Sequence, residues 1–326
     1  MFIPGSFAVA LAMMLLGMIC WGSWPSIQKA AGQWPFELFY YDFSFGFLLA
    51  AVVIALTAGT MFGGTSWLQN VAAAESSTLV FTILSGVVWN VANVLLVNGI
   101  SLVGMAVAFP VAIGIALVLS TIGGYLVMPR GDPMRLAIGV ALVFAAVILN
   151  SLAYSSSGTE KRKLSRKGLT ICIVAGVLIS TVGPIVGKAL SASRPLSPYG
   201  VTLLFTLGAF LSTFPILHLL VRHPLGGTPA PSIGYWVGTP LQHFAGVAAG
   251  SVWTLGTALT WVAANLVGIA LAMAIGQANP LIAAVWGVFV WREFRGAPPK
   301  SQVLLAIMFA LYLAGLAFLA LSARRA

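Results

Sequence analysis

The sequence predicts an all-α polytopic membrane protein with ten transmembrane helices, arranged as two five-helix repeats of inverted topology. Composition is the first observation, because 60% of the 326 residues are hydrophobic and only 7% are charged, against about 25% charged residues in a soluble domain. The second is the length of the apolar runs, which suffices to cross ~30 Å of hydrocarbon. The third is an internal repeat, which in so apolar a chain is typical of secondary transporters.

Ten apolar runs of roughly 20 residues or more, separated by polar, Gly- or Pro-containing stretches, are the expected helices. In chain order they cover residues 7–29, 38–62, 78–98, 103–127, 134–154, 168–190, 199–221, 241–262, 265–290 and 302–322. The third and fourth helices are expected to join at residues 98–101, and the eighth and ninth at residues 263–265. Connections this short predict tight helical hairpins at equivalent places.

Two segments match at a constant displacement and define the repeat. The motif Gly86-x-x-Trp89, followed by Leu102-Val103-Gly104-x-Ala106-x-Ala108, recurs 164 positions later as Gly250-x-x-Trp253 and Leu266-Val267-Gly268-x-Ala270-x-Ala272. An odd number of helices per repeat forces the second copy to insert upside down, so that the pseudo-two-fold axis lies in the membrane plane. We therefore expect a first repeat at 1–154, a basic linker at 155–167 and a second repeat at 168–326.

The net charge of +10 is interpreted as a signal for membrane orientation, not for nucleic-acid binding. Of the 16 Lys and Arg residues, nine lie in loops on the side of the linker and five on the opposite side, when Lys29 and Lys188 are left out. The positive-inside rule therefore predicts a cytoplasmic linker and both termini outside, in a bacterial inner membrane.

The first and sixth helices each carry a proline four residues before a lysine, at Pro25 and Lys29 and again at Pro184 and Lys188. A proline inside a helix removes a backbone donor and bends the helix, so both prolines are expected to break their helices. The inverted repeat would place the two lysines near opposite membrane faces. They are candidate gating or substrate-contacting cations; the alternative is that each ammonium group only reaches its own interface.

The second helix opens with the carboxylates Glu37 and Asp42, which are candidate gating or coupling groups. Asp42 is the deeper of the two and is flanked by aromatic and apolar residues, where burial would favour a proton on it unless Lys29 pairs with it. Asp42 is therefore a candidate carboxylate for coupling to protons or for a salt-bridge gate. The alternative is an acid stabilised by the dipole at the start of its helix.

The remaining helices contribute aromatic and amide side chains that are expected to meet at the repeat interface. Asn90 and Asn93 lie on one helical face, which must look into the bundle because an unpaired amide is costly in hydrocarbon. Indole rings and amides would suit a planar or ring-shaped polar solute; the alternative is that they only pack and tie helices together. The expected substrate-binding residues are Trp24, Trp89, Asn90, Asn93, Trp253, Thr257, Gln277 and Asn279, and the expected helix breaks are Pro25, Pro110, Pro184 and Pro280.

Several of these motifs resemble those of a known transporter group. They are Trp21-Gly22-Ser23-Trp24-Pro25, Tyr41-Asp42-Phe43, Gly276-Gln277-Ala278-Asn279-Pro280 and Trp286-Gly287-Val288-Phe289-Val290-Trp291-Arg292-Glu293-Phe294. With them the chain is similar to the ureide permeases and, more distantly, to the glucose/ribose uptake porters, all of the drug/metabolite transporter superfamily. The resemblance implies a five-plus-five inverted-repeat fold and facilitated or proton-coupled movement of ureides, oxo-purine or pyrimidine-type heterocycles, or sugars. Plant ureide permeases carry a long cytosolic loop where this chain has its short linker.

Together these observations predict a secondary transporter of a small, polar, uncharged metabolite that works by alternating access as a monomer, with protons as a candidate coupling ion. No enzyme activity, cofactor or metal site is expected. Two alternatives stay open: a multidrug or metabolite efflux permease of the same superfamily, and a non-transporting membrane scaffold or receptor. Lys29, expected near Asp42, argues against the cationic ligands that many efflux pumps favour.

Overall fold

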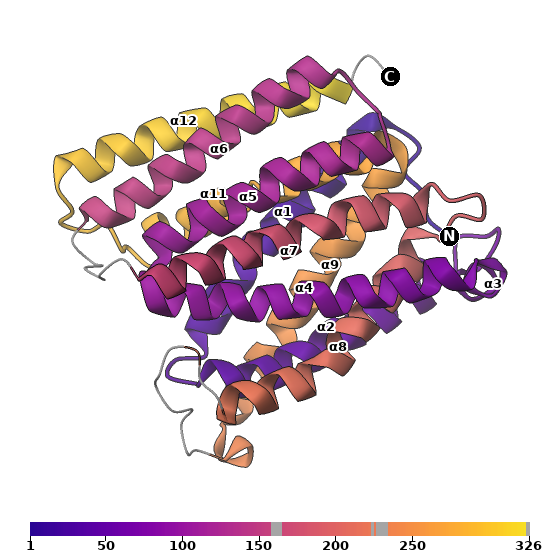
Figure 1. The fold of residues 1–326 in the computed structure, drawn as a ribbon, viewed down its shortest axis with the longest axis horizontal. Coiled ribbons are helices and arrows are strands. Elements are labelled where there is room, and N and C mark those ends of the chain that lie inside the picture. The colour runs from indigo at the N-terminus through magenta and orange to yellow at the C-terminus, as the bar shows by residue number, and fades with distance from the viewer. Residues whose placement is uncertain (158–164, 223–224, 226–233, 324–326) are drawn as a thin grey trace.

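The computed structural model describes residues 1–157, 165–222, 225 and 234–323, and these are helical without strands (Figure 1). Ten spans within them are long and apolar enough to cross a membrane, which confirms the predicted fold class. The helices are α1 (Phe7–Ala30), α2 (Phe36–Leu56), α3 (Trp67–Ala73), α4 (Ser76–Val103), α5 (Met105–Val127), α6 (Pro133–Ser156), α7 (Arg166–Leu190), α8 (Pro198–Arg222), the 3-10 helix η1 (Tyr235–Val237), α9 (Pro240–Val267), α10 (Ile269–Gly276), α11 (Pro280–Val285), the π-helix η2 (Trp286–Val290) and α12 (Pro299–Ser322).

The spans alternate in direction, so each end of the bundle collects alternate loops. We call "linker side" the end at which α1, α6 and α8 end and at which α2, α7, α9 and α12 begin. The expected linker of residues 155–167 lies partly outside the described residues, which omit 158–164. The short helix α3, between α2 and α4 at the opposite end, was not expected from the sequence.

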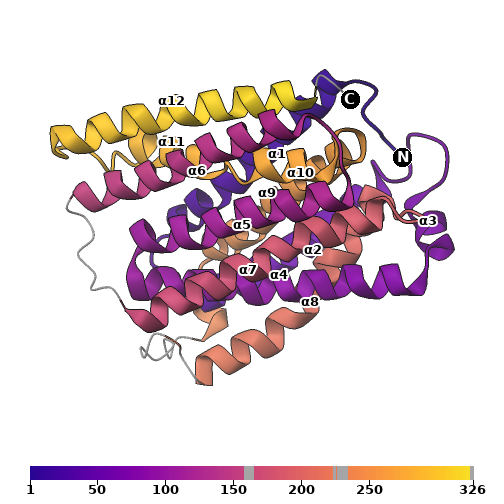
Figure 2. The same cartoon turned by 45° about the horizontal axis from the view of Figure 1, so that its top comes forward.

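Helices of the first and second halves interleave instead of forming two separate lobes. In sequence order α1 and α2 belong to the first half, yet both pack along α9, while α4 packs along α7 and α8. Helices α6 and α12 lie side by side along one edge of the bundle, as both views show (Figure 2). The interior between the halves is therefore built from both of them.

Glycines allow these helices to approach at backbone distance, which is the usual device where lipid supplies no hydrophobic drive between helices. A Cβ added at Gly250 on α9 would lie 2.8 Å from the Phe47 nitrogen of α2, and one at Gly86 on α4 would lie 2.8 Å from the Phe205 carbonyl carbon of α8. Both are shorter than real Cβ contacts, so neither position accepts a side chain without displacing the facing helix.

The two short hairpins turn at Gly104 and Gly268, a few residues beyond the expected positions 98–101 and 263–265. Helix α4 continues to Val103 and α9 to Val267, and each then reverses through a glycine with a positive φ, of 81° and 92° respectively. Such φ values favour glycine over any residue with a Cβ. The turn is therefore placed by the glycine and not by the preceding polar residues.

Of the four prolines expected to break helices, only Pro280 stands at a break. It begins α11 after the turn of residues 277–279 that follows α10. The expectation is wrong for Pro25, Pro110 and Pro184, because α1, α5 and α7 continue through them. A proline inside a helix costs one backbone hydrogen bond, which a bend and neighbouring helices can accommodate in a membrane, whereas the first position of a helix needs no such bond.

Candidate functional site

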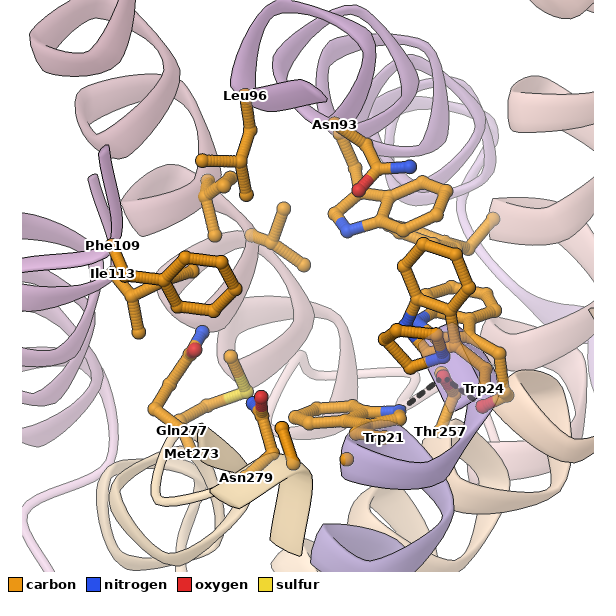
Figure 3. A pocket seen from close by; sticks show the side chains of 18 of the residues that line it. Trp21, Trp24, Asn93, Leu96, Phe109, Ile113, Thr257, Met273, Gln277 and Asn279 are labelled. Atoms are coloured by element: carbon orange, nitrogen blue, oxygen red, sulfur yellow. Dashed lines mark hydrogen bonds between the residues drawn. The ribbon is translucent and has the colours of Figure 1, made fainter. Parts of the chain in front are cut away.

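A cavity of about 120 Å³ lies in the interior of the bundle, between helices of both halves (Figure 3). Seven of the eight expected substrate-binding residues line it. They are Trp24, Trp89, Asn93, Trp253, Thr257, Gln277 and Asn279. Trp89 and Trp253 stand at the middle of the 28-residue helices α4 and α9, which places the cavity at half the depth of the bundle.

The aromatic wall differs from the expected pair of stacking platforms. Trp89 and Trp253 stack on each other, with ring centroids 4.2 Å apart and planes 29° apart, so no solute fits between them. The sequence reasoning also missed Trp21, Phe109 and Trp261, which line the cavity too. A solute would therefore meet indole and phenyl edges and faces around its rim.

Four polar side chains face this aromatic enclosure, and three of them, Gln277, Asn93 and Asn279, have atoms left for a solute. Gln277 is 5% exposed, and its amide makes no hydrogen bond to any residue that the structure describes. Asn93 donates its amide nitrogen to the Tyr40 hydroxyl at 3.0 Å and keeps its oxygen. The close-up shows Gln277 and Asn93 on opposite sides of the hollow (Figure 3). A buried amide without a partner is costly, so Gln277 is a candidate for contact with a ligand.

The other two polar side chains are partly engaged. The Thr257 hydroxyl accepts a hydrogen bond from Trp21 Nε1 at 3.0 Å and donates to the Trp253 carbonyl at 3.0 Å. Asn279 donates to the Gly276 carbonyl at 3.0 Å and retains its oxygen. Thr257 therefore orients the indole of Trp21, while Asn279 leaves one acceptor near the helix break.

Asn90 lies outside the cavity lining, contrary to expectation. Its oxygen accepts from the Tyr40 hydroxyl at 2.6 Å, and its nitrogen lies 2.9 Å from the Ala209 carbonyl, 2.9 Å from Ser212 Oγ and 3.1 Å from Thr213 Oγ1. These bonds tie α4 to α2 and α8. Asn90 is thus a helix tie, the alternative that the sequence had left open.

Lys29 does not pair with Asp42. Its ammonium lies 2.6 Å from Glu293 Oε1 and 4.8 Å from the centre of the Trp291 ring. Tyr154 donates to the second oxygen of Glu293 at 2.8 Å. The cluster joins α1, α6 and the end of the ninth span on the linker side. Lys29 is therefore paired away from Asp42 and gives no reason to exclude a cationic ligand there. Glu293 was not predicted as a partner, although it lies in a motif that the sequence singles out.

Asp42 instead pairs with residues near the start of α9. It is 3% exposed; one oxygen lies 2.9 Å from His243 Nδ1, and the other accepts a hydrogen bond from the Tyr235 hydroxyl. Glu37 is half-buried and Lys188 is exposed, and neither has an ion pair within the described part of the chain. None of the gating candidates Lys29, Glu37, Asp42 and Lys188 lines the cavity.

The chain matches known transporter families over nearly its whole length. The family model described as Sugar transport protein matches residues 12–218, and the model described as Ureide permease matches residues 164–322. Ureide permease 4 of Arabidopsis thaliana is 22% identical, over 98% of this chain and 98% of its own. Glucose uptake protein GlcU of Bacillus subtilis (strain 168) is 23% identical, over 96% of this chain and 98% of its own.

A solved crystal structure has the same fold, with a TM-score of 0.68 at 19% identity, over 98% of this chain and 99% of its own. The resemblance to ureide permeases and glucose/ribose uptake porters is confirmed by the family models and relatives. The chain is therefore a membrane permease, not an enzyme, and belongs to the sugar transport protein family.

Proposed function

We propose that this permease is a secondary transporter of a small, polar, uncharged solute, which binds in the central cavity. The observation that carries the proposal is the buried and unpartnered amide of Gln277, which faces Asn93 across the hollow. Among the residues that the structure describes, no charged side chain lines the cavity, so a net charge on the solute would be buried there without a counter-charge, which is unfavourable. Amides that both donate and accept suit a solute with adjacent N–H and C=O groups.

The size of the cavity supports a small solute. One water needs roughly 10–15 Å³ of such a volume, so a cavity of about 120 Å³ has room for on the order of ten non-hydrogen atoms. Oxo-heterocycles such as uracil and allantoin have this size, and so do monosaccharides. Since seven of the 19 lining residues are aromatic and indole and phenyl rings pack well on planar rings, we place the planar heterocycles first and the sugars second. The relatives named as ureide permeases and as glucose uptake protein fit these two classes.

Matched contacts support an inverted repeat. Gly250 abuts Phe43 and Phe47 of α2, and Gly86 abuts Phe205 and Ala209 of α8. Gly86 and Gly250 are 164 positions apart in the sequence (250 − 86). The residues that they contact are 162 positions apart, in the opposite order of halves (205 − 43 and 209 − 47). The turns at Gly104 and Gly268 are related in the same way, 164 positions apart. Two halves built alike and packed through equivalent contacts can exchange conformations, which is the basis of alternating access.

Close packing between the halves at the end opposite the linker side supports a conformation that is closed at that end. There Ile269 of α10 packs closely against Gly124 of α5, and also against Gly187 of α7. We propose that release of this packing, with closure of the linker side, produces the outward-facing state.

The remaining assignments are also proposals. We place the linker in the cytoplasm and the termini outside, in a bacterial inner membrane, on the distribution of loop cations. A chain with two repeats can enclose the whole pathway by itself, so we propose that the monomer is functional.

The test is counterflow into proteoliposomes loaded with unlabelled solute, comparing labelled allantoin and uracil with glucose and ribose. We expect uptake of the heterocycles, and a concentration for half-maximal uptake raised about tenfold in Gln277→Leu through loss of amide hydrogen bonds. Gln302→Leu is the matched control, because Gln302 is exposed on α12. Uptake of sugars alone would replace the heterocycles as the solute class. No uptake of any of the four, or equal effects of the two variants, would refute the proposal.

A further inference from the structure

We propose that Asp42, His243 and Tyr235 form a proton-binding site between the two halves of the chain, and that its occupancy controls how tightly α2 and α9 are held together on the linker side. The site lies outside the solute cavity, since none of the three residues lines it. The inference adds a control of the transport cycle to the proposed function, and only its transport measurement rests on that function.

The geometry separates a buried proton acceptor from an accessible proton exchanger. Asp42 on α2 is 3% exposed, and each of its oxygens has one partner, His243 Nδ1 at 2.9 Å and the Tyr235 hydroxyl. A carboxylate at this depth needs such partners to remain charged. The His243 side chain is 25% exposed. A proton from the linker-side solution can therefore reach His243 without passing through Asp42.

Tyr235 and Trp34 hold the imidazole in place. The ring of His243 lies 4.6 Å from that of Tyr235 and 5.4 Å from that of Trp34. Burial, and next the hydrogen bond and charge of Asp42, raise the pKa of Tyr235 well above its usual range. Its hydroxyl therefore stays a donor at physiological pH. The exchangeable proton of the cluster is therefore left to the His243 imidazole, which is the more accessible partner of Asp42.

No lysine or arginine in the described part of the chain forms an ion pair with Asp42 in competition with His243. Helix α9 carries no other titratable side chain, and α8, which also packs on α2, contributes neither an ion pair nor a hydrogen bond to Asp42 in the described residues. Among the described residues, the other titratable or charged groups at this end of α2, α8 and α1 are Glu37, Tyr40, Tyr41, His218, Arg222 and Lys29, of which Tyr40 donates to Asn90 and Lys29 is paired with Glu293. Protonated His243 is therefore the one cation in contact with Asp42 within the described part of the chain.

The position of the site links its proton to the contact between the halves. Gly246, one turn beyond His243, abuts Asp42 directly, so α2 and α9 touch at backbone distance here. With the proton on His243, a charge-assisted hydrogen bond joins the two helices. When the proton leaves, Asp42 keeps its charge but loses its counter-charge, and hydration of the carboxylate favours separation of the helices. Low pH on the linker side thus holds the contact, and high pH loosens it.

The proton site can be tested without any solute, through the fluorescence of Trp34. The pH titration of Trp34→Phe is subtracted from that of the unmodified protein, so that the signal of Trp34 beside His243 remains. We expect a transition between about pH 5 and 8 that disappears in His243→Gln and persists in His218→Gln. His218 is the matched control, because it is exposed on α8 and makes no contact with Asp42. A transition that persists in His243→Gln would overturn the proton site.

The control of transport is tested by counterflow at equal pH on both sides, from pH 6 to 8. Because a charge-assisted hydrogen bond exceeds a neutral one by about 1 kcal/mol, we expect the rate to change on the order of fivefold. The dependence should flatten in His243→Gln, weaken in Tyr235→Phe and persist in His218→Gln. An unchanged pH dependence in His243→Gln would overturn the control of the cycle. Absence of transport in the unmodified protein would refute the proposed function, while the fluorescence result would still decide the proton site.

Discussion

Adding a methyl group at Gly250 or Gly86 should weaken the packing between the halves by a calculable amount. The Cβ of Gly250→Ala would stand 2.8 Å from the Phe47 nitrogen, and that of Gly86→Ala 2.8 Å from the Phe205 carbonyl carbon, whereas ordinary contact begins at 3.4 Å. Each pair of helices must therefore move apart by more than 0.6 Å (3.4 − 2.8), because the carbonyl oxygens of Phe43 and Phe205 would lie closer still to the added Cβ atoms. Overpacking of this kind costs about 1–3 kcal/mol.

The assay is thermal unfolding of the purified protein in detergent, followed by loss of the monodisperse peak in size-exclusion chromatography. Both variants should unfold several degrees below the unmodified protein, and by similar amounts because their contacts are equivalent. Gly5→Ala is the control, since a Cβ there would meet nothing within 4 Å. If Gly250→Ala and Gly86→Ala unfold at the temperature of Gly5→Ala, the helices do not approach as closely as argued and the reasoning is refuted.

Two further predictions separate structural from functional polar groups. Asn90→Leu should lower the free energy of unfolding by about 1–2 kcal/mol, because several hydrogen bonds between membrane helices, each worth roughly 0.6 kcal/mol, are lost. The solute concentration for half-maximal uptake should stay the same. A change in that concentration without loss of stability would show that Asn90 belongs to the binding site. Lys29→Met should lower the free energy of unfolding by less than about 1 kcal/mol. The side chains of Lys29 and Glu293 are 48% and 30% exposed, and exposed ion pairs contribute little to stability. A larger loss of stability that is insensitive to salt would contradict this prediction.

Membrane helices could be located from the sequence because lipid leaves the chain few choices. A backbone in hydrocarbon must satisfy its hydrogen bonds internally, so every long apolar run becomes a helix. The conformational preferences of glycine and proline then decide where a helix turns or continues. The turn at Gly268 lies beyond the expected residues because a positive φ selects the glycine, and α1 passes through Pro25 because one missing hydrogen bond does not end a helix.

The candidate site was partly visible in the sequence. Gln277 and Asn93 were expected at the repeat interface because a polar side chain in an apolar span must face the interior. That rule applies equally to Asn90, which also faces inward but bonds to its neighbours on α2 and α8. Whether an inward amide is left free depends on what the facing helix presents, and the pattern within one helix does not contain that information.

The sequence by itself determined the number and order of the membrane spans, the family and the polar positions that face inward, because hydrophobicity and length act locally along the chain. Only the tertiary structure decided the partners. Lys29 meets Glu293, 264 residues away, and Asp42 meets His243, 201 residues away. Such pairs form only where helices that are distant in the sequence pack together. The free energy of that packing is a sum over contacts made by several helices, so it cannot be evaluated from one segment.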